Sequence, residues 1–211
     1  MLTKIAALAL VFSTTAASAG GFARPPHPTP VPITEEPIER PPMPELLPNR
    51  ADVKAALAKR RVHNLAAFHS YWTGGVYPHN TYRVGPLNVW RDATGHFCAA
   101  ATMIDKDGQH ELAAKTGDAN PYIRLLDTTE GPLLDWMMTS GFTIEEIDRI
   151  QAPAIEPERI DPQTLAAEDA KLRKGYIATE AFLKKHAAED LETATTRLMQ
   201  NPSLAWSLVR A

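Results

Sequence analysis

The chain has 211 residues, of which 44% are hydrophobic and 22% charged, and its formal net charge is −3 with neutral histidines. Nucleic-acid-binding domains usually carry a basic field, so we expect no nucleic acid as a partner. Cys98 is the single cysteine, which excludes a disulfide within the chain and leaves the fold dependent on its hydrophobic core.

The first 19 residues have the pattern of a cleaved signal peptide. Lys4 gives a basic start, residues 5–12 form a short apolar run, and Ala17-Ser18-Ala19 fits the small-residue site of signal peptidase. An uncleaved anchor is the alternative, but a spanning helix needs about 20 strongly apolar residues. We therefore expect cleavage after Ala19, a periplasmic or secreted mature protein, and no membrane span in the mature chain.

Proline density separates residues 20–48 from the rest, with 10 of the chain's 18 prolines in this stretch. Proline lacks a backbone N–H and fixes φ, so the density excludes helix and central strand. We expect a disordered, extended spacer. A proline-rich docking ligand is the alternative, which composition alone leaves open.

The hydrophobic spacing predicts a helix over residues 50–72, at the start of a helical core domain spanning residues 49–153. Asn49 is the expected N-cap. One helix face carries apolar side chains at helical intervals, namely Val53, Leu57, Leu65, Phe68 and Trp72. The basic run at residues 59–61 interrupts this face, and we interpret it as a solvated surface.

The next segments are less regular. Residues 76–91 contain too many prolines and glycines for a helix, and Leu87 and Val89 predict a short edge strand. Residues 97–104 form an apolar, alanine-rich run that predicts a buried helix. Residues 111–115 predict a helical turn or two that ends at Gly117.

Helix signals become strong again in the last third of the chain. A helix is expected over residues 130–140, and Thr143 with Glu146 forms a capping box for the next one. Asp161-Pro162 then opens a long helix to about residue 188, followed by two shorter ones in the C-terminal segment 154–211. The predicted fold is mainly α: a small helical domain with a short β element, followed by a long helical C-terminal segment.

Several ordered motifs lie within residues 62–153. They are a Gly-x-Tyr/Phe-Pro-x-Asn loop at residues 75–80, an Asp-x-x-Gly-x-x-Cys-Ala element at 92–99, Ser-Gly-Phe-Thr at 140–143 and Ile-Gln-x-Pro at 150–153. In this order they resemble an uncharacterised group of exported bacterial proteins. The resemblance implies export and a shared domain, and it supplies no activity.

Cys98 and His96 are the candidate catalytic residues. Cys98 is expected in the first turn of a helix, where the helix dipole lowers the pKa of a thiol, and His96 would serve as the base. We favour a buried core cysteine over this catalytic role, because free cysteine is among the most buried residue types; an intermolecular disulfide or a redox role is the third alternative. The same pair with another histidine is a candidate zinc site, but the spacing matches no known finger pattern. We expect no metal and no cofactor.

Seven aromatic residues fall within thirty positions: Phe68, Tyr71, Trp72, Tyr77, Tyr82, Trp90 and Phe97. Exposed, they would form a binding platform; buried, they would form the core, which we expect. The sequence favours a non-catalytic periplasmic domain that binds an unknown protein or cell-envelope component. The alternative is a cysteine-dependent hydrolase or acyltransferase centred on Cys98.

Overall fold

The computed structural model describes residues 47–81, 84–152 and 161–211, all of which belong to one compact unit. The expected signal peptide, nearly all of the proline-rich spacer, Tyr82 and most of the second linker lie outside these residues. The mainly α fold is confirmed. No helix in the described ranges has the length and apolar character needed to cross a membrane.

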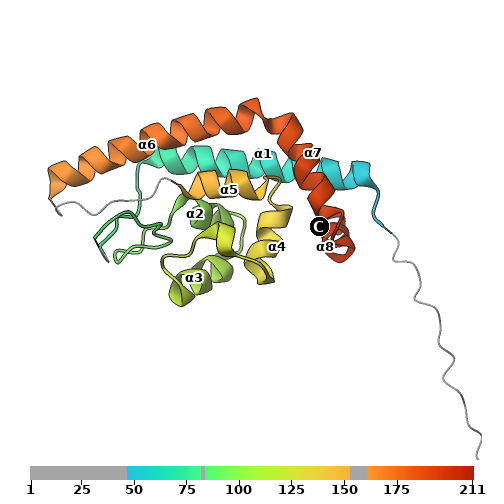
Figure 1. The fold of residues 1–211 in the computed structure, drawn as a ribbon, viewed down its shortest axis with the longest axis horizontal. Helices are drawn as coiled ribbons and strands as arrows, with labels where there is room; N and C mark the ends of the chain where they lie inside the picture. Colours follow the sequence, from blue (N-terminus) through green and yellow to red (C-terminus); the bar gives the residue numbers. More distant parts are fainter. Residues whose placement is uncertain (1–46, 82–83, 153–160) are drawn as a thin grey trace, which may run out of the picture. The chain divides into compact units, whose positions relative to one another are not determined.

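Helices account for the regular structure of the described residues (Figure 1). In chain order they are α1 (Arg50–Gly74), α2 (Ala99–Lys106), α3 (His110–Ala119), the 3-10 turn η1 (Leu125–Asp127), α4 (Gly131–Thr139), α5 (Ile144–Gln151), α6 (Pro162–Lys185), α7 (Ala187–Leu198) and α8 (Pro202–Arg210). Helix α1 is central, because α2, α6, α7 and α8 all pack against it. The C-terminal helices therefore pack on the core domain.

Local sequence signals explain both ends of α1. The side-chain Oδ1 of Asn49 accepts a hydrogen bond from Ala51 N–H at 2.8 Å, and Gly75 ends the helix with a φ of 68°. The buried face carries Val53, Leu57 and Phe68, as predicted. Tyr71 is buried in place of its neighbour Trp72, which is half-buried.

Two hydrophobic clusters fill the interior. The larger contains Phe68, Tyr71, Tyr77, Trp90 and Tyr176 together with residues of α2, α4 and α5. Phe68, Tyr71, Tyr77 and Trp90, four of the seven aromatics singled out from the sequence, are thus core residues. Trp72 and Phe97 are partly buried at the margin of this cluster. The smaller cluster joins the start of α1 to α7 and α8 through five buried side chains: Val53, Leu57, Ala194, Leu198 and Ala205.

The predicted β element is not seen. No strand occurs in the described ranges, and the segment before α2 shows an isolated bridge between Arg91 and Phe97. Leu87 and Val89 are buried on either side of a less buried Asn88, but Trp90 is buried directly after Val89, so the alternation expected of an edge strand does not continue. The backbone N–H of Trp90 donates to Pro121 O at 2.8 Å, and its carbonyl accepts from Cys98 N at 2.9 Å. Trp90 is therefore held by single backbone hydrogen bonds to two other segments of the chain rather than by a β-ladder.

Gly117 does not end α3, which continues to Ala119. A Cβ atom at this position would lie 2.9 Å from Cδ1 of the Trp90 ring. The glycine therefore serves close packing against the buried indole, whose Nε1 donates to Ala113 O at 2.9 Å. The expected helix stop is wrong because packing, not chain termination, selects glycine here.

The basic run of α1 is only partly solvated, contrary to expectation. Arg61 is buried, and its guanidinium donates to Glu146 Oε2 at 2.8 Å and Oε1 at 2.6 Å. It also donates to Gly141 O at 3.1 Å and Leu183 O at 2.7 Å. One side chain thus joins α1 to α5, to the α4–α5 turn and to α6. Four bonds to oxygen offset the cost of burying its charge.

Asp190 of α7 lies beside this ion pair. Burial, a hydrogen bond with Glu146 and repulsion by the Glu146 carboxylate raise the pKa of Asp190 to about 6. Arg61 and His186 act in the opposite direction. Arg197 of the same helix donates to Phe142 O at 3.2 Å. The docking of α7 therefore depends on charges shared with α1 and α5.

A substitution of Gly141 tests the close approach of the α4–α5 turn to α1. A Cβ atom there would meet Leu57 O at 2.4 Å and Arg61 N at 2.5 Å, and the φ of Gly141 is +87°. We expect Gly141→Ala to lower the free energy of unfolding by about 4 kcal/mol or more. Gly95→Ala is the matched control, since its φ is +93° with nothing within 4 Å; strain alone predicts about 1–2 kcal/mol. Urea unfolding gives both values, and equal losses would contradict this packing.

The raised pKa of Asp190 predicts a pH dependence of stability. The folded state binds this proton more tightly than the unfolded chain, so the contribution is present at low pH and is lost as the pH rises through about 6. We expect Asp190→Asn to match the wild type near pH 3.5, below the ordinary pKa of 3.8, and to exceed it by about 1 kcal/mol at pH 7.5, a value reduced for the partial exposure of the group. Urea unfolding at both pH values measures this, with Glu189→Gln of the same helix as control. An identical difference at the two pH values would contradict the coupling.

Candidate functional site

Cys98 does not lie in the environment of an activated thiol. It is the N-cap of α2, and its Sγ accepts from Ala101 N–H at 3.5 Å. The side chain is buried, and this burial raises the pKa of the thiol to about 11. The helix N-terminus predicted from the sequence is present, but desolvation outweighs its effect. The thiol is therefore protonated at neutral pH.

His96 lies in the loop before α2, on the solvent side. Its Nδ1 is 3.0 Å from Thr94 Oγ1 and 3.4 Å from Asp92 Oδ2, and its side chain is about half exposed. No hydrogen bond or ion pair in the described ranges joins His96 to Cys98. His96 is thus not placed as a base for Cys98, and the catalytic roles of these two residues stay predictions.

Asp92 organises this loop as a structural residue. Its carboxylate accepts from the backbone N–H groups of His79, Thr94 and His96 at 3.2, 2.9 and 2.9 Å. Burial alone would raise the pKa of Asp92, but these hydrogen bonds, with that from the Thr94 hydroxyl, hold it below its ordinary value. The Asp-x-x-Gly-x-x-Cys-Ala element is therefore explained by loop geometry. Among the described residues, no group of three or more His, Cys, Asp or Glu is placed to hold a metal.

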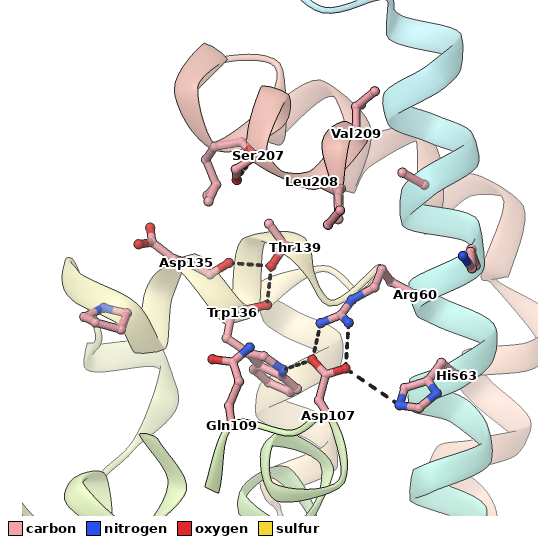
Figure 2. A pocket seen from close by; sticks show the side chains of 15 residues that line it. Arg60, His63, Asp107, Gln109, Asp135, Trp136, Thr139, Ser207, Leu208 and Val209 are labelled. Carbon is pink, nitrogen blue, oxygen red and sulfur yellow. Dashed lines mark hydrogen bonds and ion pairs between the residues drawn. The ribbon is translucent and has the colours of Figure 1, made fainter. Parts of the chain in front are cut away.

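A cleft of about 730 Å³ lies between α1, α4, α8 and the α2–α3 turn (Figure 2). A volume of this size is typical of sites for small molecules. It is lined by Ala56, Lys59, Arg60, His63, Asp107, Gln109, Pro132, Asp135, Trp136, Thr139, Leu204, Ser207, Leu208, Val209 and Ala211. Four segments far apart in the sequence therefore build it.

Asp107 holds the polar side of the cleft together. Its side chain is only 3% exposed. It accepts from Arg60 Nη1 at 2.6 Å and from Nη2 of the same guanidinium, and Trp136 Nε1 donates to it at 3.1 Å. Figure 2 shows His63 directed at the same carboxylate, at 3.7 Å from Nε2 to Oδ1. The bidentate pair fixes Arg60 as a rigid part of the wall.

Helix α8 supplies the opposite, apolar wall. Leu204, Leu208 and Val209 line the cleft from this helix, which Figure 2 shows across the cavity from Arg60 and Trp136. Ser207 lines it too, but its hydroxyl donates to Leu204 O at 2.7 Å. A serine, a histidine and an aspartate thus line one cleft without forming a catalytic triad, because the hydroxyl is engaged elsewhere.

Sequence reasoning did not find this site. The basic run at residues 59–61 is expected to be solvated, but Arg60 in that run pairs with Asp107, whose side chain is buried. A weak signal is available, since Trp136 falls within the helix expected over residues 130–140 and a buried indole N–H requires an acceptor.

No protein-family model, curated protein sequence or solved structure matches this chain. The resemblance of residues 62–153 to a group of exported proteins therefore stays a prediction. The functional interpretation depends on the geometry of the chain itself.

Alkylation of Cys98 tests its protected state. We expect iodoacetamide to react with the folded protein at pH 8.5 at least about 100-fold more slowly than with the protein in urea, because a pKa near 11 leaves little thiolate and burial blocks access. Mass spectrometry of timed samples measures both rates. Fast alkylation of the folded protein at pH 7 would contradict this environment and favour the cysteine-dependent enzyme.

Proposed function

We propose that the protein is an exported, non-catalytic binding domain whose ligand occupies the cleft between α1, α4 and α8. Export is supported by the signal-peptide pattern of residues 1–19, which lie outside the described residues. The binding role is supported by one observation above all: an apolar wall on α8 faces a rigid polar wall built on Asp107. The partner would be a molecule of the cell envelope or a part of a protein.

The two walls together suit an amphipathic ligand. An apolar portion would cover Leu204 and Leu208, and its polar groups would reach Lys59, His63 or Gln109 on the other side. Burial of apolar ligand surface would supply most of the affinity, at about 25 cal/mol per Å². The few polar groups would set orientation and specificity.

The enzyme alternative has less support. A cysteine nucleophile needs a base within hydrogen-bond reach and a partly exposed thiol. Cys98 is buried with a raised pKa, and His96 bonds to Thr94 instead. In the cleft, the hydroxyls of Ser207 and Thr139 donate to backbone carbonyls of their own helices rather than to a base.

A tryptophan introduced at Ala56 tests the proposal by filling the cleft. Three probes are used in saturation-transfer NMR: octanoate, trileucine and trehalose. We expect at least one amphipathic probe to bind the wild type and to lose at least about tenfold in affinity in Ala56→Trp, because displaced apolar contacts are lost. Ala66→Trp is the matched control, on the same helix but exposed and outside the cleft.

Ser207→Trp is a second blocking variant, placed on the opposite wall, so that the test does not depend on the folding of Ala56→Trp alone. Circular dichroism checks that both variants keep their helix content. The proposal is wrong if no probe binds, or if both blocking variants bind as tightly as the control.

A further inference from the structure

Two charged side chains of the cleft have no partner within the described residues. Lys59 on α1 makes no ion pair or hydrogen bond through its ammonium group, and Asp135 on α4 makes none through its carboxylate. The contact of Asp135 with Thr139 involves the backbone carbonyl at 2.8 Å. By contrast, Arg60 and Asp107 neutralise each other. Among the described charged side chains of the cleft, Lys59 and Asp135 are thus the unpaired cation and anion.

The two free charges belong to different sides of the cleft. Figure 2 shows the Asp135 carboxylate on α4, well away from His63 on α1. Lys59 and His63 are four residues apart on α1, so they share a face of that helix. The α1 side therefore offers a cation with an imidazole, and the α4 side offers a carboxylate.

The α8 wall of the cleft is apolar, whereas the Arg60–Asp107 pair lies on the wall opposite. Leu204, Leu208 and Val209 of α8 contribute apolar surface, with Pro132 from the first turn of α4. A complementary ligand needs an anionic group at one end, a cationic group at the other and an apolar body. A fatty acid lacks the cation, a neutral sugar lacks both charges, and a free amino acid carries both charges on one carbon.

We infer that the ligand of the cleft is a short apolar peptide with free ends, whose carboxylate pairs with Lys59 and His63 and whose ammonium group pairs with Asp135. This inference rests on the proposed binding function and names its ligand class. Both ends contribute to affinity only when charged, and the apolar side chains lie against α8. The cleft would thus recognise the charged ends of a peptide and its apolar side chains rather than a defined sequence.

Capped peptides test each end separately. Trileucine, N-acetyl-trileucine and trileucine amide are titrated by calorimetry at low salt, where exposed ion pairs are least screened. We expect each cap to weaken binding to the wild type by about fivefold, as for a partly exposed ion pair. In Asp135→Asn the acetyl cap should cost nothing further, and in the double variant Lys59→Gln/His63→Gln, which removes both partners of the carboxylate, the same should hold for the amide cap.

Matched controls are Glu189→Gln on α7 and Lys174→Gln on α6, both exposed and outside the cleft. They should respond to the caps as the wild type does. The inference is wrong if the caps have no effect, or if their effects persist in the matching cleft variants.

The two proposals fail differently. If octanoate binds the wild type and loses affinity in Ala56→Trp, while trileucine does not bind, the peptide inference fails and the binding function stands. If no probe is affected by the blocking variants, both fail.

Discussion

The burial of one guanidinium constrains much of this fold. Arg61 lies inside the protein because its charge is paired with Glu146 and its remaining hydrogen-bond donors reach two backbone carbonyls. An uncompensated buried charge costs several kcal/mol. The positions of α5, α6 and the α4–α5 turn are therefore constrained, because each supplies an oxygen that accepts a hydrogen bond from Arg61. The close approach of Gly141 to the α1 backbone belongs to the same junction. Asp190 extends it to α7, and α7 leads directly into the helix that walls the cleft.

Local structure was predictable wherever the signal itself is local. Asn49, the Thr143–Glu146 capping box and Asp161-Pro162 all begin helices where the sequence places them, because a cap needs only residues within one turn. The last helix likewise starts at Asn201-Pro202. These residues explain why the mainly α fold followed from sequence alone.

The errors share a different cause. Leu87 and Val89 have the composition of a strand, but no strand in the described ranges pairs with them, and the core takes their side chains instead. Arg61 and Lys59 look alike in a basic run, and only the distant Glu146 distinguishes them. The cleft could not be predicted because it joins four segments of the chain, among them Arg60 and Asp107, through tertiary contacts. Cys98 was assigned a helix N-terminus correctly, but its burial depends on packing around it.

The division of the interior into two clusters bears on how such a protein can diversify. Helix α8 is anchored by Ala205 in the smaller cluster, with Val53, Leu57 and two residues of α7. The larger cluster holds the aromatic core and does not include α8. Leu204, Leu208 and Val209 line the cleft and also pack against the smaller cluster, so substitutions there would alter both while leaving the main core intact. Under the proposed function, the side chains that contact the ligand on α8 are also those that hold this helix in place, so a change of ligand would carry a cost in stability.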